Sequence, residues 1–176
     1  QSFTSGSSFL GQEAEVGLAG ELGHSILPYR AGLAGMDVAD AWLTPAAAAV
    51  EAALPYVRLQ LSSDGQGVAS IEGNVLCGRA CLRGSAIFDT TRIIARQNLR
   101  HCAITMDLFP TQSPAGLETK ITALAPRCDG RLASLVIQLG IDDALSDGLA
   151  AALGGNITLR KQNFAAELAA RLKAMP

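Results

Sequence analysis

Residues 56–61 read YVRLQL, and residues 64–65 read DG. Apolar and polar side chains alternate along the first segment, a pattern typical of a β-strand with one buried face. Asp-Gly is a favoured pair in tight hairpin turns, so the chain is expected to reverse at Asp64-Gly65. These residues predict an antiparallel hairpin.

The alternation recurs in three later segments, with turn signals at residues 114–116 and 129–130 between them. The segments are CAITMDL at residues 102–108, LETKI at residues 117–121 and LVIQL at residues 135–139. We therefore predict that residues 56–141 are mainly antiparallel strands.

Helices are expected before and after these strands in the sequence. Residues 44–54, TPAAAAVEAAL, begin with a Thr-Pro pair suited to a helix N-terminus. Residues 142–153 precede two glycines, a common signal at a helix C-terminus. Residues 163–173 form another candidate, with an apolar face made by Phe164, Leu168 and Leu172.

The 176 residues, 49% apolar and 17% charged, suit one globular domain of the α+β class. We predict an antiparallel sheet covered by two or three helices. Residues 1–43 give no clear pattern, and residues 142–176 are expected to run helix–strand–helix. No apolar run reaches the length of about 18 residues needed to span a membrane. The net charge of −2 offers no support for nucleic-acid binding.

The four cysteines Cys77, Cys81, Cys102 and Cys128 allow three complete pairings. Their spacing suits neither a zinc site nor a C-x-x-C redox motif, so no metal or cofactor is expected. Cys102 and Cys128 are symmetric about the turn at residue 115, which favours disulfides Cys77–Cys81 and Cys102–Cys128. The first bond requires a turn or a helical loop between its cysteines. Reduced, buried thiols are the alternative.

No catalytic motif is present around the two histidines, His24 and His101. His101 is next to Cys102, but adjacent side chains on a strand point to opposite faces. A small α+β enzyme that uses His101 or His24 with a carboxylate is therefore only the alternative hypothesis.

One segment is markedly basic. Between Cys77 and Cys102 lie five arginines and one acid, a charge of +4, so the rest of the chain carries −6 to reach −2. Guanidinium groups suit carboxylate and phosphate partners. The four-residue spacing of the last three predicts a surface that faces a partner or an anion, formed by Arg92, Arg96 and Arg100. A solvated face is the other interpretation.

Several glycine-containing phrases resemble those of β-rich bacterial envelope proteins of the type II secretion N-subunit and AsmA-like kind. They are GNV at residues 73–75, GSAIFD at 84–89, DGRL at 129–132 and LGGNITL at 153–159. The resemblance implies a non-catalytic periplasmic role in secretion assembly or lipid handling, and it transfers no site residue.

Together these features predict a periplasmic or secreted, disulfide-stabilised binding or assembly module without catalytic residues. Its partner would be a protein or an apolar ligand, and a homo-oligomer is compatible with the sequence. The polar start at Gln1 is compatible with a processed precursor or a trimmed chain.

Overall fold

The longest strand pair is the predicted hairpin. The computed structural model describes residues 18–25, 33–37, 52–78, 81–154 and 163–176. In it, β2 (Ala52–Ser63) pairs antiparallel with β3 (Gln66–Cys77). Asp64 and Gly65 between them have φ values of 49° and 79°. Two successive positive φ values are the geometry of the tight turn that Asp-Gly favours, so the hairpin prediction is confirmed.

Three further strands complete a five-stranded antiparallel sheet with the order β1-β4-β3-β2-β5. They are β1 (Met36–Asp37), β4 (Cys81–Arg83) and β5 (Cys102–Asp107). The strand predicted at residues 102–108 is therefore present as β5. It pairs with β2 and forms one edge of the sheet.

A β-bulge in β2 keeps its apolar residues on one face. Leu54 lies opposite Val75 and Val57 lies opposite Gly73, so two residues of β2 face only one residue of β3 between these pairs. Because Val75 and Gly73 are two residues apart on a regular strand, Leu54 and Val57 stay on the same face. Both are buried.

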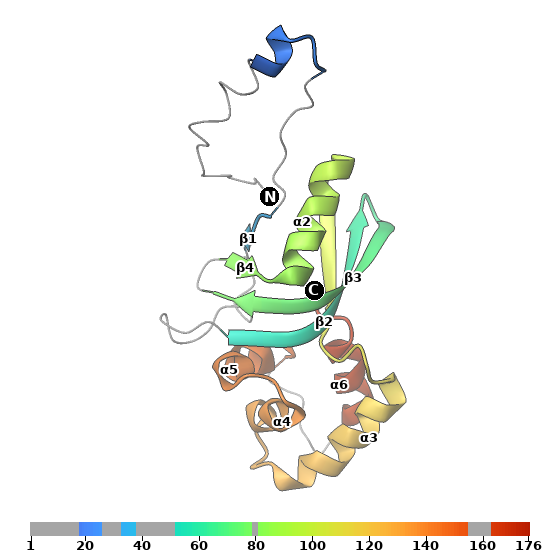
Figure 1. Cartoon of the computed structure of the whole chain (residues 1–176). Helices are drawn as coiled ribbons and strands as arrows, with labels where there is room; N and C mark the ends of the chain where they lie inside the picture. Colours follow the sequence, from blue (N-terminus) through green and yellow to red (C-terminus); the bar gives the residue numbers. More distant parts are fainter. Residues whose placement is uncertain (1–17, 26–32, 38–51, 79–80, 155–162) are drawn as a thin grey trace.

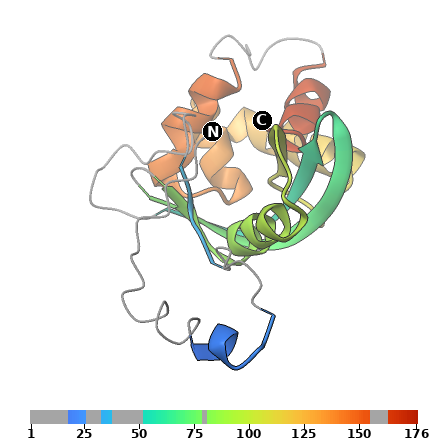
Figure 2. The same cartoon turned by 90° about the horizontal axis from the view of Figure 1, so that it is seen from above.

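The helices gather in two places around this sheet (Figures 1 and 2). α2 (Ser85–Gln97) packs mainly against β3 and lies above the sheet in Figure 1. The helices below the sheet are α3 (Pro114–Leu124), α4 (Leu132–Leu139), α5 (Asp143–Ala152) and α6 (Phe164–Leu172). A short 3₁₀ helix, η2 (Ala125–Arg127), follows α3, while α3 packs on α6 and α4 on α5.

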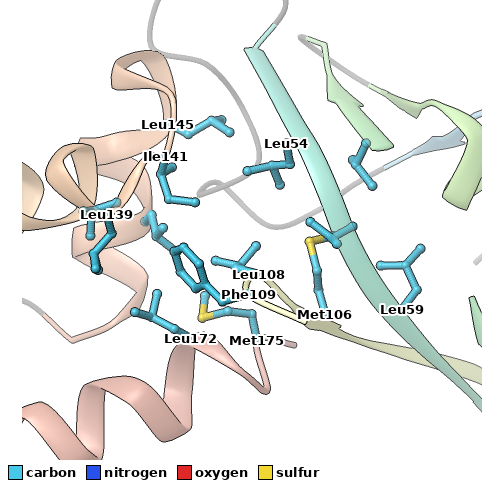
Figure 3. Packing of buried hydrophobic residues seen from close by; sticks show 14 of the residues in the cluster. Leu54, Leu59, Met106, Leu108, Phe109, Leu139, Ile141, Leu145, Leu172 and Met175 are labelled. Atoms are coloured by element: carbon cyan, nitrogen blue, oxygen red, sulfur yellow. The ribbon is translucent and has the colours of Figure 1, made fainter. Parts of the chain in front are cut away.

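One hydrophobic core joins these elements (Figure 3). Leu54 of β2 points towards Ile141 and Leu145, and Met106 of β5 lies near Met175. Buried residues of α2 belong to the same cluster. An antiparallel sheet with helical cover in a single α+β domain is thus confirmed. None of the helices in the described part of the chain has the length and hydropathy to cross a membrane.

The strands predicted at residues 117–121 and 135–139 are wrong, because both segments are helical. Ser113 caps α3 by accepting a hydrogen bond from the Gly116 N–H at 3.1 Å, and Pro114 follows it in the first turn. Leu117 and Ile121, four residues apart, are then both buried on one helix face. The described part of residues 56–141 therefore combines four strands with α2, α3, η2 and α4, rather than being mainly strands.

The helix predicted at residues 44–54 is also wrong at its end. Its last three residues, 52–54, belong to β2 and pair with residues 75–77 of β3, while residues 44–51 lie outside the described residues. Long-range pairing thus outweighs the helix propensity of alanine here. Pro55 is tolerated because it sits in the bulge.

The last two helix predictions are confirmed. α5 is capped by the carboxylate of Asp142, which accepts from the Ala144 N–H at 3.0 Å, and the chain leaves it through Gly154 with φ of 88°. α6 buries Leu168 and Leu172. The strand predicted between these helices falls at residues outside those described.

Candidate functional site

The predicted arginine surface lies at the outer side and C-terminal end of α2. Arg92 and Arg96 are exposed one turn apart, whereas the opposite side of the helix is buried. Arg92 pairs with Asp89 at 2.7 Å. The helix ends at Asn98, which has a left-handed backbone, so Arg100 lies beyond it. The three arginines therefore do not form one helical stripe, which corrects that part of the prediction.

The loop that carries Arg100 is fastened to the tip of the hairpin. The Ser63 hydroxyl donates to the Arg100 carbonyl oxygen at 2.6 Å, and the Asp64 N–H donates to that of His101 at 3.4 Å. His101 itself has a positive φ of 47°. These contacts hold the backbone of the loop in place, while the side chains of Arg100 and His101 are exposed.

Arg96, Arg100 and His101 together form what we call the basic tip. All three side chains are exposed. Within the described part of the chain, neither Arg96 nor Arg100 makes an ion pair. Asp64 adds one negative charge beside this loop. Unpaired guanidinium groups on a fixed backbone are suited to bind carboxylates or phosphates.

The predicted disulfides are not seen, because all four cysteines are free thiols. Cys77 lies opposite Leu82 in the β3–β4 pair, so Cys81 points to the other face of the sheet, towards Gly35. Burial, and then the nearby negative charge of Asp142, raise the pKa of Cys77 to about 12. This thiol is a packing residue rather than a nucleophile.

The predicted Cys102–Cys128 disulfide is absent for a different reason. Its prediction required two antiparallel strands joined at residue 115, but that position lies in the first turn of α3. Cys102 instead begins β5, and Cys128 ends η2, where its thiol donates to the Leu124 carbonyl oxygen at 3.5 Å. Burial raises the pKa of Cys128.

Among the described residues, neither histidine has an ion-pair partner that could activate it. His24 and His101 are both exposed. No ion pair between described residues links either imidazole to a carboxylate. The enzyme hypothesis requires a histidine and a carboxylate within hydrogen-bond reach of each other. The enzyme hypothesis therefore finds no support in the described residues.

A charged network that the sequence did not reveal crosses the polar face of the sheet. Arg58 lies opposite Glu72 on one side and opposite Asp107 on the other. Its guanidinium contacts the Glu72 carboxylate at 2.6 Å and reaches Asp107 at 4.0 Å. Hydrogen bonds from Tyr56, and then from Arg58, lower the pKa of Glu72, and the bond to Glu72 raises that of Tyr56.

At the buried end of this network, Lys173 has all three of its donors occupied. Its Nζ donates to Asp107 Oδ2 at 2.8 Å, to the Phe109 carbonyl oxygen at 2.9 Å and to that of Gln112 at 2.8 Å. Asp107 Oδ1 accepts from the Phe109 N–H at 2.9 Å. An ammonium with no free proton for another acceptor joins α6 to the sheet and is not a reactive group.

A shallow depression lies between the start of α4 and α5. It has a volume of about 340 Å³, and it carries the exposed ion pair of Arg131 and Asp147 at 3.6 Å. Such an open, charged surface does not resemble an apolar ligand pocket. Among the described residues, no three His, Cys, Asp or Glu side chains come together as metal ligands would.

Comparison with known proteins gives no family for this chain: no family model matches it, and no curated protein is significantly similar to it. The resemblance to envelope proteins therefore stays a prediction from short sequence phrases.

Proposed function

We propose that this protein is a non-catalytic binding or assembly module whose docking surface is the basic tip, with Arg92 at its border. Its partner is a protein segment or surface rich in carboxylates. The observation that carries this proposal is the contrast between the arginines. Arg58 lies in a network of carboxylates within the fold, whereas the guanidinium groups of Arg96 and Arg100 form no ion pair with a described residue.

Charge and rigidity support this assignment. Arg100 and His101 sit on a loop bonded to the hairpin tip, and Arg96 is in the last turn of α2. Docking on a prearranged backbone orders only the side chains, which lowers the entropy lost on binding. Complementary charge mainly accelerates association and selects the partner.

The compartment belongs to the same proposal. We place the module outside the cytoplasm, in envelope secretion, on the resemblance to envelope proteins alone, because the free thiols lend no support. Lipid handling is the weaker version, since the depression between α4 and α5 is shallow and charged.

Retention on immobilised poly-glutamate at increasing salt tests the docking surface. The double variant Arg96→Ala/Arg100→Ala should be eluted at lower salt and bind about tenfold more weakly, with a flatter salt dependence. The matched control is Arg127→Ala/Arg131→Ala, which removes the same charge from exposed positions in η2 and directly before α4. Equal losses in the two variants would refute a specific basic tip.

A further inference from the structure

The outer edge of β5 is paired over only part of its length. The Met106 N–H donates to the Met175 carbonyl oxygen at 2.7 Å, and the Met175 N–H donates back at 2.9 Å. The Leu108 N–H also bonds to the Leu172 carbonyl oxygen at 3.0 Å. The end of the chain thus covers this edge where β5 ends and approaches the helices.

The other half of the edge has no hydrogen-bonding partner among the described residues. In an antiparallel pair, the backbone groups of every second residue point away from the neighbouring strand. Because those of Met106 point outward, those of Ile104 and Cys102 do so as well. No hydrogen bond from a described residue reaches these outward groups.

This open half lacks the usual protection of an edge strand. The segment Cys102–Met106 reads CAITM, with no proline and no charge, and edges of this kind readily accept another strand. The side chains of Cys102 and Ile104 pack against the core, so the backbone between them is held in the extended form of a strand. The basic tip immediately precedes it in the chain.

We propose that this open edge binds an extended acidic peptide segment of the partner as an added strand. Its backbone bonds to Ile104 and Cys102, and its carboxylates reach Arg100 and Arg96. This inference rests on the proposed function, because the basic tip supplies the charge selectivity. It adds the conformation of the bound segment and the hydrogen bonds that recognise it.

A second copy of the chain fits the edge less well. If two β5 strands paired antiparallel about Ala103, residue 100 of each would lie opposite residue 106 of the other. That position is already bonded to Met175. Self-pairing would therefore be limited to the three residues around Ala103, whereas a peptide can continue from Ile104 past the basic tip.

A pair of synthetic peptides of alternating glutamate and valine separates the two claims. One has a normal backbone, and the other is N-methylated at every second amide, which removes the peptide N–H groups that would donate to the carbonyl oxygens of Cys102 and Ile104 without changing the peptide's charge. The normal peptide should bind at least about tenfold more tightly, since two or more hydrogen bonds are lost. It should also slow amide hydrogen exchange at Cys102 and Ile104, with little change at Leu54 in the core.

The outcomes distinguish the two proposals. Equal affinity of both peptides, lost in Arg96→Ala/Arg100→Ala, overturns strand addition and leaves acidic docking in place. Affinity that is unchanged in that variant overturns the proposed function. A concentration-dependent dimer in sedimentation that protects the same two amides without peptide would assign the edge to self-association and overturn the peptide proposal.

Discussion

Lys173 and Asp107 are 66 positions apart in the chain, and their charged groups are 2.8 Å apart in the fold. The Asp107 side chain is 8% exposed and that of Lys173 is 16% exposed, so the pair is largely shielded from water. The same lysine also binds two carbonyl oxygens in the connection between β5 and α3. One side chain therefore ties the end of α6 to the edge of the sheet.

Replacing this lysine should destabilise the fold markedly. Lys173→Met leaves Asp107 buried without its closest cation, which should lower the free energy of unfolding by about 3 kcal/mol. Urea unfolding measures the change. In a double-mutant cycle with Asp107→Asn, a coupling energy below about 0.5 kcal/mol would contradict a buried, interacting pair.

The turn before α2 should tolerate no side chain at Gly84. This residue has φ of 109°, and a Cβ there would come within 2.5 Å of the Asn74 carbonyl oxygen. Gly84→Ala is expected to cost more than 2 kcal/mol, because a steric clash is added to about 1–2 kcal/mol of backbone strain. Gly130→Ala is the matched control.

At Gly130 φ is 82° and a Cβ would have open space around it, so only the strain remains. Thermal unfolding should therefore give a clearly lower melting temperature for Gly84→Ala than for Gly130→Ala. Equal melting temperatures would mean that the connection at Gly84 and Asn74 is looser than the structure indicates.

Stability should depend on the ionisation of Cys77 at alkaline pH. Its thiol has a pKa of about 12 in the fold against about 8.5 in the unfolded chain. The folded state thus disfavours the thiolate, so this contribution is complete below about pH 8.5 and is lost as the pH rises towards 12. Between these values the slope approaches about 1.4 kcal/mol per pH unit.

The Cys77→Ala variant should lose this alkaline component, and Cys81→Ala, at a half-buried position, should keep most of it. Unfolding free energies at several pH values test the difference. In the native protein, a thiol reagent should modify Cys81 and Cys102 before Cys77. A titration of thiols after unfolding without reductant should count four per chain if the cysteines are free. A lower count would show that a disulfide is present.

The arginines of the docking surface should contribute little to folding. Replacing Arg92, Arg96 and Arg100 with alanine should change the free energy of unfolding by less than about 1 kcal/mol, because the Arg92–Asp89 pair is exposed. Thermal unfolding of the triple variant provides the measurement. An unfolded triple variant would show that these side chains are structural and would remove the basis for docking.

Several local features of the fold could be predicted from the sequence. Asp64-Gly65 specifies its turn because two adjacent residues there adopt positive φ easily. β5, α5 and α6 follow from short-range alternation or capping, as at Asp142. For the candidate site, the composition located the arginines near residues 92–100, since charge clustering along a chain needs no structure to be seen.

Where the spacing of apolar residues fits both a strand and a helix, the tertiary structure decided which one forms. Leu117 and Ile121 are four residues apart, a spacing that suits a strand face and a helix face alike, and the Ser113 cap and packing against α6 select the helix. Residues 52–54 become a strand because residues 75–77 offer them hydrogen bonds that local propensity cannot anticipate. The contact of Lys173 with Asp107, the separation of the cysteines and the open edge beside Arg100 share one physical reason. Each depends on which distant segments meet, and that is set by burial of the whole core rather than by any neighbour in the chain.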